Sequence, residues 1–277
     1  MGNKLQKFLK LPITPASLSL LEKLMVKTHF GGPAKCNVCG LFTLLYVRNN
    51  DLKESCKCLN CHATNRQRQM AFFFCQTVNT ITGQSFSSLK ELAKLDNSGL
   101  VVYNTEANGA FHKYLAPLKG YICSEYIGDN FKSGEIVNGV MHQDLRALSF
   151  ETESIDLFLT SDVFEHVSDP YKAFQEVYRV LKKGGRHIFT VPFNPDQFLD
   201  DKRAKVDSDG QLVLLKPPIY HGDPLDLAGG ILVYNLFGIE MLVKLAEMNF
   251  QANLYQLHSR FYGIFGPQTL VFETIKV

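Results

Sequence analysis

Long apolar segments are missing from this sequence, and so is an excess of charge of either sign. No apolar run approaches the roughly 20 residues that a helix needs to cross a bilayer, so no membrane span is expected. Residues 1–10 are charged and lack the apolar core of a signal peptide, which favours a cytoplasmic protein. Lysine and arginine number 29 against 27 acids, and the net charge of +2 creates no overall field that would attract nucleic acid.

Cysteine, in contrast, is concentrated in one short segment. Five of the seven cysteines lie between residues 36 and 61, which in an intracellular chain indicates a metal site rather than disulfides. Cys36-x2-Cys39 and Cys58-x2-Cys61 are separated by eighteen residues, the spacing of paired knuckles in structural zinc sites. Four thiolates complete the tetrahedral coordination of zinc and leave no position for water. We therefore predict a structural zinc ion held by these four cysteines.

The residues around the second cysteine pair leave two questions open. Cys56 and His62 are further donors beside this pair, so either is an alternative fourth ligand. Arg66 and Arg68 follow at the start of a helix, where guanidinium groups and helix N-terminal amides can hold an anion. A solvated helix face is the favoured interpretation. An extended basic and aromatic stripe is absent from the sequence, so nucleic acid is not an expected partner.

Helices are expected on both sides of the cysteine segment. Thr14-Pro15 begins one whose apolar residues are Leu18, Leu21, Leu24 and Met25. A second carries Met70, Phe74, Val78 and Ile81, and Ser88 with Glu91 forms a capping box for a third.

From Leu100 on, short apolar runs alternate with helical stretches, as in βαβ units with a parallel sheet. Five strands are expected, over residues 100–104, 120–125, 136–142, 155–161 and 186–191. Asp169-Pro170 starts a helix that carries Leu181 and ends at Gly184-Gly185.

The C-terminal part of the sequence departs from this alternation. Residues 194–230 are rich in Asp, Pro, Gly and Lys and are expected to form an insertion or lid. A helix over 239–248 is followed by two consecutive strands, 251–258 and 268–275, without a helix between them. This order predicts an antiparallel hairpin added to the parallel sheet.

Polar residues recur where the expected parallel strands end, which is where such sheets bind ligands. The turn after the first strand contains Glu106, Asn108 and Gly109. Glu125, followed by Tyr126, ends the second strand about 20 residues later, where a carboxylate can accept both ribose hydroxyls of an adenosine. An acid on the surface is the alternative interpretation.

The third strand is followed by Asp144 and Leu145. This carboxylate is suited to accept the amino group of an adenine, with an apolar side chain beside the ring.

Two longer segments resemble a known family. Residues 155–167 (IDLFLTSDVFEHV) and 179–186 (RVLKKGGR) are similar to the fourth and fifth motifs of class I S-adenosylmethionine-dependent methyltransferases of type 11, related to ubiquinone-biosynthesis enzymes. The similarity covers about residues 99–192. It implies a Rossmann-like α/β fold with an antiparallel terminal strand and an S-adenosylmethionine cofactor. The turn from Glu106 to Gly109 would lie near the methionine part of the cofactor.

The same resemblance implies that Glu125 contacts the ribose, Asp144 the adenine, and Ser161 and His166 the cleft for cofactor and acceptor. The first motif departs from the family, because Tyr103, Thr105 and Ala107 stand where an acid and two glycines are usual.

The activity expected is methylation of an oxygen or nitrogen atom of a small-molecule or sugar-like acceptor. His166 is the candidate base because imidazole titrates near neutral pH, and His221 in the insertion is a second catalytic candidate. A catalytically silent protein that uses its zinc module for interactions is the alternative, and a nicotinamide oxidoreductase is a weaker one. A homodimer is left open.

The expected organisation has three parts. Residues 1–35 form a helical segment, 36–97 a zinc-binding ribbon with connecting helices, and 98–277 a methyltransferase domain with its lid at 194–230.

Overall fold

The computed structural model describes residues 18–95, 99–222, 230–267 and 269–277. The chain divides into two compact units. The first comprises Met1–Cys123 and Asn253–Glu273, and the second comprises Ser124–Ala252 and Thr274–Val277. No helix among the described residues is long and apolar enough to cross a membrane.

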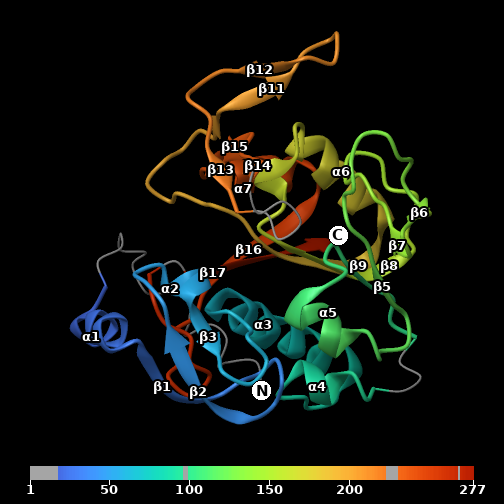
Figure 1. Cartoon of the computed structure of the whole chain (residues 1–277). Coiled ribbons are helices and arrows are strands. Elements are labelled where there is room, and N and C mark those ends of the chain that lie inside the picture. The colour runs from blue at the N-terminus through green and yellow to red at the C-terminus, as the bar shows by residue number, and fades with distance from the viewer. Residues whose placement is uncertain (1–17, 96–98, 223–229, 268) are drawn as a thin grey trace. The chain divides into compact units, whose positions relative to one another are not determined.

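Figure 1 labels most of the helices and strands along the chain. Those of the first unit are α1 (Leu20–Thr28), β1 (Phe30–Lys35), β2 (Phe42–Val47), α2 (Leu52–Ser55), β3 (Cys56–Cys58), α3 (Asn65–Thr82), α4 (Leu89–Leu92), β4 (Val102–Asn104), α5 (Gly109–Leu115) and β5 (Tyr121–Cys123). Those of the second are β6 (Ile136–Val137), β7 (Val140–Met141), β8 (Ile155–Ser161), the 3₁₀ helix η2 (Phe164–His166), α6 (Pro170–Val180), β9 (Leu181–Thr190), β10 (Asp201–Lys202), β11 (Ala204–Val206), β12 (Leu212–Leu214), β13 (Tyr220–His221), β14 (Ile231–Leu232), β15 (Asn235–Leu236) and α7 (Glu240–Glu247). The units share β16 (Phe250–Gln256) and β17 (Leu270–Lys276).

The cysteine segment forms a small antiparallel sheet of order β1-β2-β3. Pro33 lies opposite Leu44, and Leu45 lies opposite Cys58. The first cysteine pair occupies the turn between β1 and β2, and the second begins at the end of β3. The sheet therefore brings both pairs to the same place in the first unit.

Helix α3 begins directly after the second cysteine pair. Thr64 caps its N-terminus by accepting from the amide of Gln67, and the Gln67 side chain accepts from the amide of Thr64. Met70, Phe74 and Val78 are buried, as the apolar period predicts, whereas Ile81, the fourth residue of the predicted face, is exposed.

Helix α1 differs from its prediction. The expected start at Thr14-Pro15 lies outside the described residues, and the cap is Ser19, which forms a capping box with Glu22. Leu21 and Leu24 are 41% and 54% exposed, so the predicted apolar face is only partly covered.

The expected α/β class with a mostly parallel sheet is confirmed. In the first unit β4 and β5 pair in parallel, with Tyr103 opposite Ile122. In the second unit β8 and β9 pair in parallel, with Phe158 opposite His187.

The prediction of a single third strand over 136–142 is wrong. Residues 136–141 form a tight antiparallel hairpin in which Ile136 pairs with Met141. Asn138 and Gly139 occupy its turn with φ values of 51° and 81°. An Asn-Gly pair is the strongest short-range signal for a two-residue hairpin because both residues tolerate positive φ.

The boundary between α6 and β9 also differs from the prediction. Helix α6 begins at Pro170, as expected, but it ends at Val180, and Leu181 already belongs to the strand. The insertion contains paired strands that its sequence does not reveal, among them β11 and β12. Figure 1 shows these two strands as a ribbon projecting from the second unit.

An aromatic cluster forms the core of the second unit beside β8 and β9. Phe164 stacks on Phe174 with ring centroids 4.0 Å apart, and His187 stacks on Phe189 at 4.4 Å. His187 is fully buried, and its Nε2 lies 2.9 Å from the hydroxyl of Thr160. Burial lowers the pKa of His187 from 6.5 to about 3, because the charged form loses its hydration.

This burial predicts a loss of stability in mild acid. In the unfolded chain His187 binds a proton below pH 6.5, whereas in the folded chain it stays neutral down to about pH 3. Folding stability therefore falls as pH decreases below 6.5, by about 2 kcal/mol at pH 5 from this group. Urea unfolding of the wild type and of His187→Gln at pH 7.5 and pH 5 measures this difference. An equal loss of stability in both proteins would contradict it.

The loop between β16 and β17 packs on the zinc module within the first unit. The amide of Lys35 donates to the carbonyl of Phe261 at 2.8 Å, and the amide of Gly266 donates to the Glu22 carboxylate at 2.7 Å. Gly263 adopts φ +63°, and a Cβ there would overlap the side chains of Leu45 and Ala34. The loop and the module therefore share one core.

Candidate functional site

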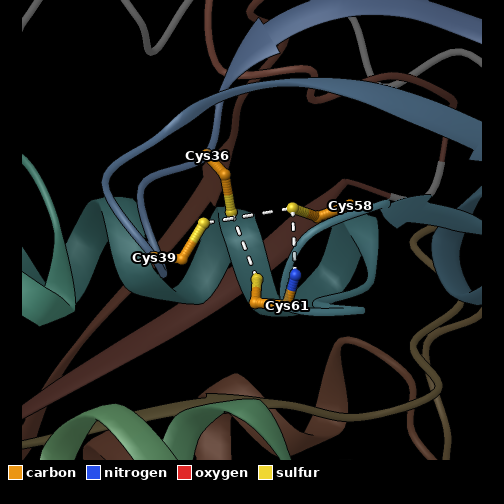
Figure 2. Close-up of side chains that lie close together, drawn as sticks. All are labelled: Cys36, Cys39, Cys58 and Cys61. Atoms are coloured by element: carbon orange, nitrogen blue, oxygen red, sulfur yellow. Dashed lines mark hydrogen bonds between the residues drawn. The ribbon is translucent and has the colours of Figure 1, made fainter.

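The four predicted cysteine ligands come together in the first unit. Their side chains point toward a common centre (Figure 2), and all four sulfur atoms lie within 4.8 Å of one another. The Sγ atoms of Cys36 and Cys61 are 3.7 Å apart, and those of Cys39 and Cys58 are 4.0 Å apart. A tetrahedral zinc ion with bonds of about 2.3 Å separates its sulfur ligands by about 3.8 Å. The cluster therefore fits zinc.

The two cysteine pairs are held by the same backbone pattern. The amide of Gly40 donates to the carbonyl of Cys36 at 2.7 Å, and the amide of His62 donates to the carbonyl of Cys58 at 2.9 Å. Both donors adopt a left-handed backbone, with φ values of 76° and 60°. His62 is therefore the left-handed residue that closes the turn of the second cysteine pair. Its exposed side chain is not part of the sulfur cluster.

Close contact among the thiols separates their pKa values. A hydrogen bond with Cys36 lowers the pKa of Cys39 to about 6. A hydrogen bond between Cys36 and Cys58 likewise lowers the pKa of Cys58. Hydrogen bonds with neighbouring thiols raise the pKa of Cys36 and of Cys61. Some thiols therefore retain their protons when only protein atoms surround them. A bound cation would stabilise all four thiolates.

Cys56, the alternative ligand, lies outside this cluster. Its sulfur accepts from Nη2 of Arg68 at 3.4 Å. Burial raises the pKa of the Cys56 thiol, and the guanidinium of Arg68 partly offsets this effect.

Arg68 is itself completely buried and also donates to three backbone carbonyls, those of Cys56, Ala63 and Gly263. Arg66 forms an ion pair with Glu54. Arg68 is therefore a structural residue that ties the second knuckle to the loop after β16, and the favoured interpretation of a solvated face does not hold for it.

Three of the predicted cofactor residues follow β4 in the first unit. Gly109, the first residue of α5, adopts φ +77°, and a Cβ there would overlap the Glu106 carboxylate. Glu106 therefore lies against the N-terminus of this helix. Asn108 is the exposed residue before it, and buried Asn104 fixes the turn by donating to the carbonyl of Glu106 at 2.9 Å.

Glu125 and Tyr126 lie at the beginning of the second unit. Glu125 forms a parallel bridge with His142, and its amide donates to the carbonyl of Met141 at 3.0 Å. The segments that lead to Glu125 and to Asp144 therefore run side by side in the same direction. The half-exposed Tyr126 donates its hydroxyl to Asp129.

Asp144 is engaged by a neighbouring cation. Its two carboxylate oxygens accept from the guanidinium of Arg146 at distances of 2.7 to 3.1 Å. Burial favours the neutral form of Asp144, but the hydrogen bonds from Arg146 outweigh this and lower its pKa. Leu145 is buried beside it. An adenine amino group at Asp144 would share oxygens that already accept hydrogen bonds.

The last three predicted site residues come from two segments. Ser161 and His166 lie at or just after the carboxyl end of β8, and His221 lies in the insertion. Ser161 is the last residue of β8 and pairs with Thr190 of β9. His166 ends η2, and its ring centroid lies 5.1 Å from that of His221 in β13, with the two planes nearly perpendicular.

Between these imidazoles lies Glu165, a fully buried residue that the sequence analysis overlooked. In the sequence, its position next to His166 was the signal that could have indicated a functional role for Glu165. Its role depends on His221, which is distant in the sequence.

The sequence comparisons are consistent with these arrangements. Residues 108–189 match the family model described as a methyltransferase domain. The match covers about 30% of the chain, the part that contains β8, α6 and most of β9. The predicted resemblance to methyltransferases is thereby confirmed for this segment. No curated protein matches the chain.

The chain is also similar to several solved structures. An S-adenosylmethionine-dependent methyltransferase from Mesorhizobium loti is 15% identical, with 68% of this chain and 95% of that chain covered and a TM-score of 0.41. A putative enzyme of the same description from Listeria monocytogenes is 14% identical, with coverages of 68% and 95% and a TM-score of 0.41. A complex of the Trm112 methyltransferase activator with a putative methyltransferase from Haloferax volcanii gives 12% identity, coverages of 75% and 95%, and a TM-score of 0.40.

Proposed function

We propose that this methyltransferase uses S-adenosylmethionine to methylate an oxygen or nitrogen atom of a small-molecule or sugar-like acceptor. The observation that carries the proposal is the meeting of His166 and His221 around Glu165, directly after β8. Ligands of parallel sheets bind at the carboxyl ends of the strands, so these side chains are suited to contact an acceptor.

Each remaining residue has a role in this proposal. Glu125, on a segment parallel to that of Asp144, supplies acceptors for ribose hydroxyls. Glu106 stands at the N-terminus of α5, where it would face the amino group of the methionine part. Ser161 follows along the cofactor, and the zinc ion stabilises the first unit without taking part in the reaction.

Methyl transfer requires only two contributions from the protein. The sulfonium methyl group of S-adenosylmethionine is already activated, so the chain has to align an acceptor and remove its proton. Nδ1 of His166 lies 2.8 Å from the carbonyl of Leu232 and donates to it, which leaves Nε2 with its lone pair. This nitrogen can accept a proton from a hydroxyl or an amine.

Binding of the cofactor is the first test of the proposal. We expect S-adenosylmethionine and S-adenosylhomocysteine to bind the wild type in calorimetry, and Glu125→Ala to weaken both by at least about tenfold, the value of one good hydrogen bond to a charged group. Glu135→Ala, at an exposed acid in the same unit, is the matched control and should bind as the wild type does. A screen of hydroxyl and amine acceptors for methyl transfer follows.

An interaction module without catalysis is the second candidate. Two contacts favour it, because each engages a predicted cofactor residue with protein atoms. The Glu106 carboxylate lies against Gly109, and the Asp144 carboxylate pairs with Arg146. The same titration separates the two, because wild-type protein that binds neither cofactor form would contradict the enzyme and support the module.

A further inference from the structure

The second unit contains a carboxylate in an unfavourable position. Glu165 is 0% exposed, and neither of its carboxylate oxygens has a hydrogen-bond partner among the described residues. Burying a carboxylate without a partner is costly, so native proteins rarely retain one unless it binds something. A cation bound beside Glu165 would supply the partner that its carboxylate lacks among the described residues.

Two imidazoles face this carboxylate. Nε2 of His166 lies 3.8 Å from Oε1 of Glu165, and Nδ1 of His221 lies 3.7 Å from the same oxygen. These separations are too long for hydrogen bonds. Three ligand atoms on a metal with bonds of 2.0 to 2.2 Å lie about 3 Å apart or slightly more, so a small inward movement of the side chains would complete such a site.

The surrounding backbone holds the three side chains in this arrangement. The amide of Tyr234 donates to the carbonyl of Glu165 at 2.7 Å, and His221 pairs with Ile231 across β13 and β14. Nδ1 of His166 donates to the carbonyl of Leu232, which leaves the lone pair on Nε2, the nitrogen that lies 3.8 Å from Glu165. Metal-binding histidines are usually oriented by such a hydrogen bond from their second nitrogen.

We propose that Glu165, His166 and His221 bind a divalent transition-metal ion. Two imidazoles and one carboxylate suit Mn²⁺, Co²⁺, Fe²⁺ or Zn²⁺ better than Mg²⁺ or Ca²⁺, which prefer oxygen ligands alone. Three protein ligands leave coordination positions open, in contrast to the four-cysteine site. The second metal site is therefore suited to bind an additional ligand.

The open positions point to a hydroxyl acceptor, an extension that rests on the proposed methyltransferase function. A metal-bound hydroxyl loses its proton to solvent more readily than a free one. Its oxygen would then form a bond to the methyl carbon while the carbon–sulfur bond breaks and its electron pair stays on sulfur. In this arrangement both histidines are ligands, and the metal replaces the need for His166 as a base.

Metal binding can be measured without any acceptor. Zinc-loaded full-length protein, with its four cysteines occupied, is titrated with Mn²⁺ and with Co²⁺ while the free ion is followed by electron paramagnetic resonance or the bound ion by visible absorption. We expect the wild type to bind one further ion per chain. Glu165→Gln and His221→Ala should weaken this binding by at least about tenfold. Glu165→Gln removes a buried charge without changing shape, so it should fold as the wild type does.

His62→Asn is the matched control, because it removes an exposed imidazole beside the cysteine site and asparagine tolerates the same left-handed backbone. It should leave the second ion in place. Absence of saturable binding of both ions to the wild type, or equal binding by the wild type and Glu165→Gln, would overturn the proposal. Cofactor titration of the same samples keeps the two hypotheses separate, since metal binding without S-adenosylmethionine binding contradicts only the proposed function.

Discussion

Replacing Cys58 with serine is expected to lower the zinc content by one ion per chain and to unfold the module built on β1, β2 and β3. Cys58 lies at the end of β3, and its sulfur is 4.0 Å from that of Cys39. Structural zinc contributes about 10 to 16 kcal/mol of apparent binding free energy in small zinc modules, which is comparable to the whole stability of a typical domain. The variant should therefore lose its cooperative thermal transition in the first unit. Metal analysis and circular dichroism measure both effects.

Cys56→Ser is the matched control for this experiment. Cys56 is as buried as Cys58 but contacts Arg68 instead of the other sulfur atoms. The control should keep its zinc and most of its stability. Equal loss of zinc from both variants would assign Cys56 to the metal and contradict the four-cysteine site.

Arg68→Met is expected to destabilise the first unit by about 3 to 5 kcal/mol, as removal of one partner from a buried charged network does. Three buried carbonyls would lose the guanidinium as a donor, and of these the carbonyl of Ala63 keeps the amide of Cys58 as a second donor. Leaving buried acceptors unsatisfied costs about 1 to 3 kcal/mol each before the structure relaxes. Urea unfolding monitored by circular dichroism gives the loss.

Arg66→Met separates this effect from a general effect of charge. Arg66 stands two positions earlier on α3 and pairs with Glu54, whose side chain is 39% exposed. An exposed ion pair contributes about 1 kcal/mol or less. If both variants lost the same stability, the buried network of Arg68 would not be what stabilises the unit.

The cluster of four cysteines was predictable because its signal is local. Each pair of cysteines is contained in one turn, and the ligand chemistry depends on residue type and short spacing. The alternation of strands and helices predicted the parallel sheet for a similar reason, since each element carries its own apolar period. The hairpin at Asn138 and Gly139 also had a local signal, which the longer apolar run from residue 136 to 142 concealed.

Other features depend on contacts between distant segments. Arg68 follows three polar residues and resembles part of a solvated face, yet its environment is completed by the carbonyl of Gly263. The meeting of Glu165 with His221 likewise requires the insertion to fold back onto η2, for which the amide of Tyr234 provides a hydrogen bond. No periodicity within either segment encodes such contacts. The cofactor residues stay predictions until binding is measured.

The contribution of residues 253–273 to the first unit has a consequence during protein synthesis. Glu22, Asn65 and Arg68 all bind backbone groups of residues 263–266. A ribosome produces the cysteine segment long before it reaches these residues. Until nearly two hundred further residues have been translated, these three side chains lack the partners that residues 263–266 supply. Early capture of the metal by its four cysteines would hold the knuckles together through that interval.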